Sequence, residues 1–405
     1  MYRLYRRGEQ EIALEKLGIE TLHMWQEEVL PHILCFEDVL YMIPTSGGKS
    51  LLYQLPAVMD GGAALTIVIS PMLALQKDQV STMRDHGIQS EFLNSELSVE
   101  ERYRILNGLG SASLLYLAPE QLGSHDLLNA LSRCEVSRVV VDEAHLLPEQ
   151  KDGFRPAFAQ IGNFIRSFAD RPQVIACTAT ATETERKTII ESLHMDEPFV
   201  YEGSIHRSNL YLAVKHVSKK EYIENLVLAE LNNWNKKGRA LIFAPSIPMV
   251  KELKGVLKNH GVKALGFHAK MSPKDKEKNV EKFRSGKCKV MIATSAFGLG
   301  VDIPNIHLII HAGLPLGFSD YVQQIGRGGR DGKPTRCVLI YTKSNKTSNM
   351  FTVLKSGPAN YARKNADMDD LLGAICSDTC LWKSIAKFYG QKLHNCGHCD
   401  HCQRA

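Results

Sequence analysis

Short runs of hydrophobic, often β-branched residues recur along the chain, and helical periodicity follows most of them after a turn. Runs that are apolar throughout predict parallel strands that helices bury on both faces of a sheet. The runs fall into two sets, which predicts an α/β fold with two tandem parallel-sheet domains joined near residues 204–210. The expected strands are Val39–Ile43, Leu65–Ile69, Leu114–Leu117, Val139–Val141, Val174–Cys177, Ala240–Phe243, Ala264–Phe267, Val290–Ala293, Leu308–His311 and Cys337–Tyr341.

The strand pattern stops beyond Lys343, where polar sequence of helical character leads to a group of cysteines. This change predicts a third, smaller, helical unit that binds zinc. The expected boundaries are 1–204, 205–343 and 344–405. A length of 405 residues is consistent with more than one hydrophobic core.

Charge and cysteine are both concentrated at the C-terminal end of the chain. The formal net charge is +5, and all of it lies in residues 331–405, while residues 1–330 are neutral. Five of the ten cysteines lie in the last thirty residues, which argues against a secreted disulfide scaffold. No apolar run approaches the ~20 residues that span a bilayer, and Met1–Gln10 does not resemble a signal peptide, because its arginines are followed by no apolar stretch. We therefore expect an intracellular protein, in the nucleus of a eukaryote or the cytoplasm of a prokaryote.

A glycine-rich loop follows the first expected strand and precedes an expected helix, Leu51–Met59. Such a loop turns backbone N–H groups toward phosphates at a helix N-terminus. Lys49 is expected to reach the β- and γ-phosphates of ATP, and Ser50 to bind Mg²⁺. Ile43 stands where the general pattern has glycine, so a plain strand–helix turn is the alternative. The loop residues expected to contact ATP are Thr45, Ser46, Gly47, Gly48, Lys49 and Ser50.

Two acidic residues end the fourth expected strand, at the edge where α/β sheets bind ligands. Asp142 is expected to bind Mg²⁺, and Glu143 to act on the attacking water. The alternative, that both acids only cap the next helix, is less consistent with a phosphate loop earlier in the chain.

Two arginines follow in the second half, Arg327 and Arg330, beside several glycines. Their spacing of three predicts that both lie on one side of a helix and reach the same polyphosphate, where arginine stabilises transition-state charge. A flexible basic loop is the alternative. The catalytic residues predicted from these patterns are Lys49, Asp142, Glu143, Arg327 and Arg330.

These motifs, in this order, resemble those of superfamily 2 helicases, and the finer matches resemble the RecQ family, over Leu17 to Cys402. The resemblance implies that both parallel-sheet domains are RecA-like and that the protein is an ATP-dependent 3′-to-5′ DNA helicase or translocase, active in repair or recombination and monomeric. It implies binding of single-stranded and tailed duplex DNA. By resemblance, Gln26 reads adenine, and Asp302 and Gln323 also belong to the nucleotide site. The DNA contacts implied in the same way are Ser70, Lys77, Phe154, Arg155, His268 and Thr294.

Cysteine spacing near the C-terminus is typical of a closed, structural zinc site. The spacing leaves more than one ligand set open, because Cys376 and the histidines His394, His398 and His401 lie close to the group. The family resemblance favours the set Cys380, Cys396, Cys399 and Cys402. The expected cofactors are therefore ATP, Mg²⁺ and Zn²⁺.

The chain also departs from the RecQ pattern. Gln150 and Asp152 replace a Trp and a His of the aromatic-rich loop, although stacking on aromatics supplies ~1–3 kcal/mol per base. The sequence ends three residues after Cys402, so winged-helix and C-terminal helical domains are not expected in it. A DNA-binding translocase or annealing factor with weak unwinding is a second hypothesis, and a superfamily 2 RNA helicase is a third.

Overall fold

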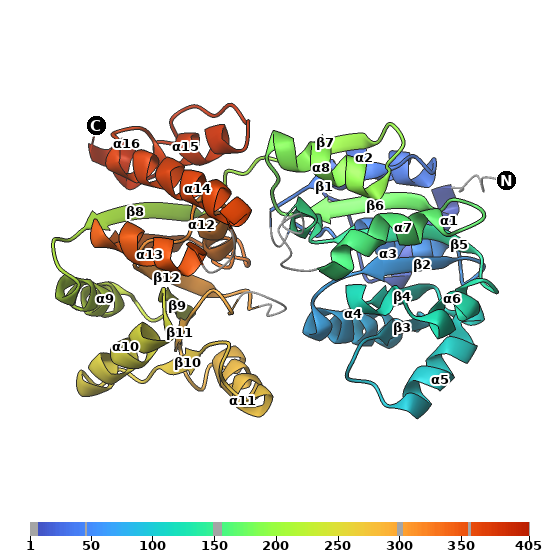
Figure 1. The fold of residues 1–405 in the computed structure, drawn as a ribbon, viewed down its shortest axis with the longest axis horizontal. Helices are drawn as coiled ribbons and strands as arrows, with labels where there is room; N and C mark the ends of the chain where they lie inside the picture. The colour runs from blue at the N-terminus through green and yellow to red at the C-terminus, as the bar shows by residue number, and fades with distance from the viewer. Residues whose placement is uncertain (1–6, 45–46, 149–155, 298–302, 355–357, 405) are drawn as a thin grey trace. The chain divides into compact units, whose positions relative to one another are not determined.

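The computed structural model describes residues 7–44, 47–148, 156–297, 303–354 and 358–404. The chain divides into two compact units, Met1–Gly203 and Ser204–Ala405 (Figure 1). Each unit is built around its own parallel sheet with helices on both faces, and the second also holds the cysteine-rich tail. The fold class expected from the hydrophobic pattern is confirmed.

The sheet of unit 1 has the strand order β3-β4-β2-β5-β6-β1-β7 within the described residues. Every neighbouring pair is parallel, so the carboxyl ends of all its strands lie at one edge. The strands are β1 (Val39–Met42), β2 (Leu65–Ile69), β3 (Ser90–Leu93), β4 (Leu114–Leu117), β5 (Val136–Asp142), β6 (Gln173–Thr178) and β7 (Phe199–Glu202).

Two hydrophobic clusters hold the helices of unit 1 against opposite faces of this sheet. Apolar side chains of α1 to α4 share one cluster with Val39, Tyr41 and Val140. Those of α5 to α8 share the other with Leu40 and Val141. The helices are α1 (Arg7–Lys16), α2 (Met24–Leu34), α3 (Leu51–Met59), α4 (Leu73–Asp85), α5 (Val99–Gly108), α6 (His125–Leu131), α7 (Ile161–Arg166) and α8 (Glu183–Leu193).

Unit 2 repeats the plan, with the described strand order β10-β11-β9-β12-β13-β8 and parallel pairing throughout. Helices α9 and α10 cover one face, and α11, α12, α14 and α15 cover the other. The strands are β8 (Leu210–His216), β9 (Arg239–Phe243), β10 (Leu265–Phe267), β11 (Val290–Ala293), β12 (Ile306–Ala312) and β13 (Thr335–Tyr341). The helices are α9 (Glu221–Asn233), α10 (Ile247–Asn259), α11 (Pro273–Arg284), α12 (Phe318–Ile325), α13 (Ser344–Leu354), α14 (Pro358–Cys376), α15 (Leu381–Phe388) and α16 (Asp400–Arg404).

A fully buried ion pair lies inside unit 1. Arg138 of β5 is 0 % exposed, and its Nη1 lies 2.5 Å from Oδ2 of Asp60. Its Nε also donates to Oε1 of Gln173 at 3.0 Å, and its guanidinium lies over the ring of Phe36. Because a buried charge without its partner is strongly unfavourable, the pair is expected to matter for stability.

We expect Arg138→Met to lower the free energy of unfolding by about 3–5 kcal/mol, since the buried Asp60 carboxylate would lose the guanidinium that pairs with it. Denaturant unfolding measures the loss. The double variant Asp60→Asn/Arg138→Met removes both charges and should regain much of the stability. Equal destabilisation by the single and double variants would contradict this account of the pair.

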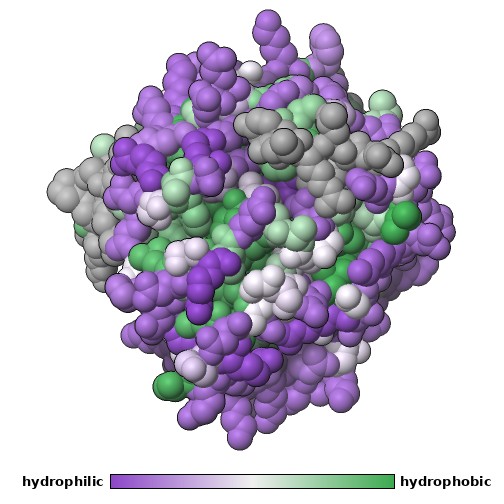
Figure 2. All heavy atoms as spheres, turned by 90° about the vertical axis from the view of Figure 1, so that its right-hand side faces the viewer, coloured by the Kyte–Doolittle hydropathy of each residue, from purple (hydrophilic) through white to green (hydrophobic). Residues whose placement is uncertain are grey.

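The surface of the molecule is largely polar on the face that Figure 2 shows, with smaller apolar areas between the hydrophilic side chains. Within the described ranges, no helix is both long enough and apolar enough to span a bilayer.

Candidate functional site

The loop between β1 and α3 is fastened at the carboxyl edge of the unit 1 sheet. The hydroxyl of Tyr41 donates to the backbone oxygen of Lys49 at 2.8 Å. The Lys49 ammonium donates to the backbone oxygen of Ile43 at 3.2 Å. A neutral carbonyl therefore holds the ammonium at the end of β1, where an anionic phosphate can replace it as the partner.

Gln26 is buried beside the same loop and connects it to α2. Its Nε2 donates to the backbone oxygen of Gly48 at 2.9 Å, and its Oε1 accepts from the N–H of His23 at 2.8 Å. Gly48 has φ of +77°, and an added Cβ would lie 2.9 Å from Gln26 Nε2. At Gly47, an added Cβ would lie only 2.2 Å from Cγ2 of Ile43. Both positions therefore require glycine.

We expect Gly48→Ala to weaken ATP binding at least tenfold, because the methyl group would displace Gln26 and distort the loop. Gly61→Ala is the matched control. Gly61 also has a positive φ, +62°, but nothing lies within 4 Å of an added Cβ. Both variants should lose about 1–2 kcal/mol of stability from the left-handed backbone. Calorimetric ATP titration that shows equal affinities for the two would contradict the role of Gly48.

Asp142 ends β5, and its buried carboxylate is at the centre of the acidic part of the site. Oδ1 accepts from the Glu143 N–H at 2.9 Å and from the Cys177 thiol at 3.3 Å. Oδ2 accepts from the Ser70 hydroxyl at 3.5 Å. Burial, with a contribution from the charge of Glu143, raises the pKa of Asp142 to about 6, although Lys49 acts in the opposite direction.

These surroundings are consistent with a hard cation at Asp142. Apart from the Glu143 N–H, the donors to this buried carboxylate are a thiol and a distant hydroxyl, and Mg²⁺ prefers carboxylate oxygen ligands of this kind. The ion would stabilise the charged form that burial disfavours. Lys49 already acts electrostatically on the same carboxylate.

Side-chain contacts connect Glu143 to β6, the next strand along the chain. It has φ of +53°, in the left-handed region, and its Oε2 lies 3.3 Å from Nδ1 of His145. His145 Nδ1 lies 3.0 Å from the hydroxyl of Thr178, which donates to the backbone oxygen of Thr180 at 3.2 Å. A change at the Glu143 carboxylate can therefore reach the loop that follows β6.

The residues expected to contact DNA lie in different environments. In unit 1, Ser70 is buried beside Asp142, and Lys77 of α4 pairs with Glu96 at 2.6 Å while half exposed. In unit 2, His268 and Thr294 follow β10 and β11, and the Thr294 N–H donates to the oxygen of Phe267 at 3.1 Å. The structure therefore brings His268 and Thr294 together at the carboxyl edge of the second sheet.

The arginine pair does not lie on a helix, so that expectation was wrong. Helix α12 ends at Ile325, with Gly326 as its C-cap, and the following residues form a turn in which Gly329 has φ of +54°. Arg207 Nη2 donates to the Gly329 oxygen at 2.6 Å and connects the turn to the segment that precedes β8. Glycines therefore end the helix before Arg327 and Arg330, while Gln323 remains within α12.

Some predicted residues lie outside the part of the chain that the structure describes. They are Thr45, Ser46, Phe154, Arg155 and Asp302.

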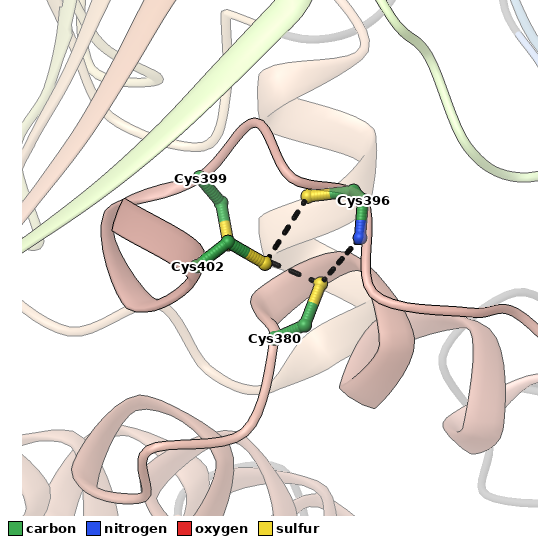
Figure 3. A group of neighbouring side chains, drawn as sticks. All are labelled: Cys380, Cys396, Cys399 and Cys402. Carbon is green, nitrogen blue, oxygen red and sulfur yellow. Dashed lines mark hydrogen bonds between the residues drawn. The ribbon is translucent and has the colours of Figure 1, made fainter. Parts of the chain in front are cut away.

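Four cysteine side chains point toward one another in the tail (Figure 3). All four sulfur atoms lie within 4.8 Å of one another, and two pairs, Cys396–Cys402 and Cys380–Cys399, are 3.9 Å apart. A tetrahedral zinc ion with Zn–S bonds of ~2.3 Å requires sulfurs about 3.8 Å apart. The sulfur positions are therefore consistent with one zinc ion.

The alternative ligands have other partners. Cys376 lies 3.2 Å from the hydroxyl of Tyr341, and His401 Nδ1 lies 2.8 Å from the backbone oxygen of Thr379. The ring of His398 packs edge-on against Tyr211. Over the described residues, the only group with metal-ligand spacing is the four-cysteine group.

Electrostatics in the group favour a cation. Burial raises the pKa of Cys380, but hydrogen bonds from the backbone N–H groups of Cys396 and Lys383 and from the Cys396 and Cys402 side chains together outweigh it and bring the pKa to about 7. Burial and the sulfurs of Cys380 and Cys399 raise the pKa of Cys396. Several thiolates can form together only when a positive charge balances them, and a zinc ion would supply that charge.

Two contributors to the candidate nucleotide site were not predicted from the sequence. Tyr41 fastens the Lys49 backbone, and Cys177 donates to Asp142. Each is the next-to-last residue of its strand. Position near the carboxyl end of an expected strand was therefore the available signal.

Comparison with known proteins shows which families the two halves of the chain resemble. Residues 23–188 match the DEAD/DEAH box helicase model, and residues 218–332 match the helicase conserved C-terminal domain. A solved structure of the DEAD-box helicase Mss116, bound to ssRNA and UDP-BeF, superimposes with a TM-score of 0.69 at 20% identity. The match covers 87% of this chain and 76% of that one. At this identity, the similarity concerns the fold alone.

Curated relatives give the closer relationship. The chain is 32% identical to the ATP-dependent DNA helicase RecQ of Bacillus subtilis, across 97% of this chain and 66% of that protein. It is 34% identical to the protein of the same name from Synechocystis, across 82% of this chain and 71% of the relative. Against the Pasteurella multocida and Haemophilus influenzae RecQ proteins it spans 63% and 62% of their length. The chain belongs to the RecQ family of helicases.

Proposed function

We propose that this protein is an ATP-dependent DNA helicase that moves 3′ to 5′ and couples strand separation to DNA-stimulated ATP hydrolysis. The main support is the meeting of the Lys49 loop with the buried Asp142 carboxylate at one sheet edge, in a member of the RecQ family. We also propose the division into parts 1–204, 205–343 and 344–405, and a role in DNA repair or recombination.

The residues of unit 1 have distinct roles in this proposal. Gln26 recognises the adenine, and the backbone of Gly47 and Gly48 turns toward the phosphates. Lys49 leaves the Ile43 carbonyl and pairs with the phosphates, while Ser50 and Asp142 hold Mg²⁺. When bound, Mg²⁺ neutralises charge that develops on the phosphate oxygens.

Hydrolysis needs a water molecule oriented toward the terminal phosphate, and Glu143 is proposed to hold it. The contacts from Glu143 through His145 to Thr178 supply a path by which hydrolysis changes the loop after β6. Arg327 and Arg330 stabilise transition-state charge, and Gln323 and Asp302 complete the nucleotide site. DNA is proposed to contact Ser70, Lys77, Phe154, Arg155, His268 and Thr294.

The decisive experiment combines ATPase and unwinding assays on the full chain. We expect single-stranded DNA to stimulate ATP hydrolysis, and a duplex with a 3′ tail to be separated while one with a 5′ tail is not. Strong stimulation without separation of either duplex would favour a translocase or annealing factor. Preference for an RNA duplex would instead support an RNA helicase.

A further inference from the structure

The amino edge of the unit 2 sheet carries a row of exposed lysines, at the opposite end of the strands from His268 and Thr294. Because every pairing is parallel, the residues that precede the strands share this edge. In the order β10, β11, β9 and β13, the exposed residues before the strands are Lys263, Lys289, Lys237 and Lys333. We call these four the amino-edge row.

Contacts among the loops place the row on one continuous surface. Lys289 Nζ donates to the backbone oxygen of Lys236 at 3.1 Å, and the Cys288 thiol donates to the oxygen of Lys263 at 3.4 Å. Nδ1 of His307, the second residue of β12, lies 3.1 Å from the oxygen of Lys237. Five neighbouring strands at ~4.8 Å spacing make the row about 19 Å long.

Little negative charge opposes the row. Among described residues, neither Lys237 nor Lys263 has an ion-pair partner, while Lys333 lies 3.9 Å from Asp331. Asp331 is itself engaged with Nε2 of His307 at 2.8 Å. The edge therefore keeps a positive field that surface lysines scattered among acids would not have.

A groove of about 780 Å³ continues from the row, and its lining includes Lys237 and Lys333. Its one carboxylate, Glu230, is buried and already balanced by Lys215 at 2.7 Å and Arg336 at 2.9 Å. The groove therefore keeps a net positive charge.

The same groove contains an aromatic residue with an unused donor. The indole N–H of Trp234 is buried and has no hydrogen-bond partner in the described part of the chain. A cationic track combined with an aromatic side chain is the usual arrangement for binding single-stranded nucleic acid. A row of cations that crosses several β-strands also matches an extended polynucleotide, with its regularly spaced phosphates, better than it matches a ligand with a single anionic group.

We propose that the amino-edge row and its groove form a second binding surface for single-stranded DNA, with lysines contacting phosphates and Trp234 contacting a base. The inference rests on the proposed function in that DNA is the ligand. The surface would hold a strand on the side of unit 2 away from the helicase motifs.

The test measures binding of a labelled oligothymidine of about 20 nucleotides, without ATP, by fluorescence anisotropy at roughly 50 to 200 mM salt. We expect Lys237→Gln/Lys289→Gln/Lys333→Gln to weaken binding and to reduce the slope of log affinity against log salt by about 2. The control Lys16→Gln/Arg133→Gln/Arg166→Gln removes three exposed charges from unit 1. It should bind like the parent.

A second measurement uses the fluorescence of the protein's three tryptophans. DNA should quench the tryptophan fluorescence of the parent protein. The variant Trp234→Phe should lose this quenching, and its circular dichroism spectrum should show an intact fold. Unchanged salt slope in the triple variant, or poly-glutamate bound more tightly than DNA, would overturn the inference. ATPase and unwinding assays on the same variants show separately whether the proposed helicase function holds.

Discussion

Replacement of Lys49 by alanine is expected to lower the kcat of DNA-stimulated ATP hydrolysis by about 10²–10³-fold. Lys49 is the only lysine in the described part of the phosphate loop. In the structure its ammonium donates a hydrogen bond to the neutral Ile43 carbonyl. During turnover that ammonium would stabilise charge on the transferring phosphate, and alanine has no group that can do so. A coupled-enzyme ATPase assay with saturating single-stranded DNA measures the effect.

The structure predicts that this variant folds normally. One partly buried hydrogen bond, worth about 1 kcal/mol, is lost, and the backbone contact from Tyr41 is unaffected. DNA binding without ATP should therefore persist. Lys16→Ala, at the exposed end of α1, is the matched control and should retain full activity. Turnover by Lys49→Ala at the parent rate would refute the nucleotide-site assignment.

The sequence predicted the central strands well because they are buried on both faces and their apolar runs are unbroken. The three strands that it missed, β3, β7 and β8, lie at sheet edges. β3 has partly exposed residues at its centre, and β7 has no fully buried position. Edge strands face less protein, so their sequences need not be apolar throughout. The expected linker near 204–210 also concealed the start of β8, at Leu210.

The candidate site was predicted unevenly for similar physical reasons. Loop and acidic residues could be proposed from the sequence because their chemistry is local, within a few residues of a strand end. The arginine pair was placed on a helix because spacing of three matches a helical turn, but Gly326 and Gly329 end the helix first. Tyr41 and Cys177 were missed because contacts between strands depend on sheet order, which the sequence pattern does not specify.

The choice among zinc ligands shows the same limit. Spacing alone allowed Cys376 and His401, which lie near the group in sequence. In the structure the Cys376 sulfur lies beside the Tyr341 hydroxyl, and the His401 ring lies beside a backbone carbonyl. The sulfurs of the other four cysteines of the tail lie together. Side-chain direction in three dimensions therefore separates residues that spacing could not.

Loss of the four-cysteine centre should have the largest effect on stability. The tail packs against edge strand β8. The backbones of Cys399 and Leu212 form an isolated parallel β-bridge, and the Asp400 carboxylate accepts a hydrogen bond from the Val214 N–H at 3.0 Å. Trp382 is buried there and donates to the Leu210 oxygen at 3.3 Å. Anything that releases the cysteines would therefore also uncover β8.

We expect Cys396→Ser, or removal of zinc by a chelator, to unfold the tail. Apparent zinc-binding free energies of about 10–16 kcal/mol are as large as the stability of a whole domain, ~5–15 kcal/mol. The parent should contain about one zinc ion per chain, the variant none, and its Trp382 emission should shift to the red. Cys376→Ser, which leaves the four sulfurs in place, is the control and should keep its zinc. ATP binding to Cys396→Ser should persist, because the Lys49 loop lies in unit 1. A metal-free parent with an unchanged melting temperature after chelation would contradict a structural zinc site.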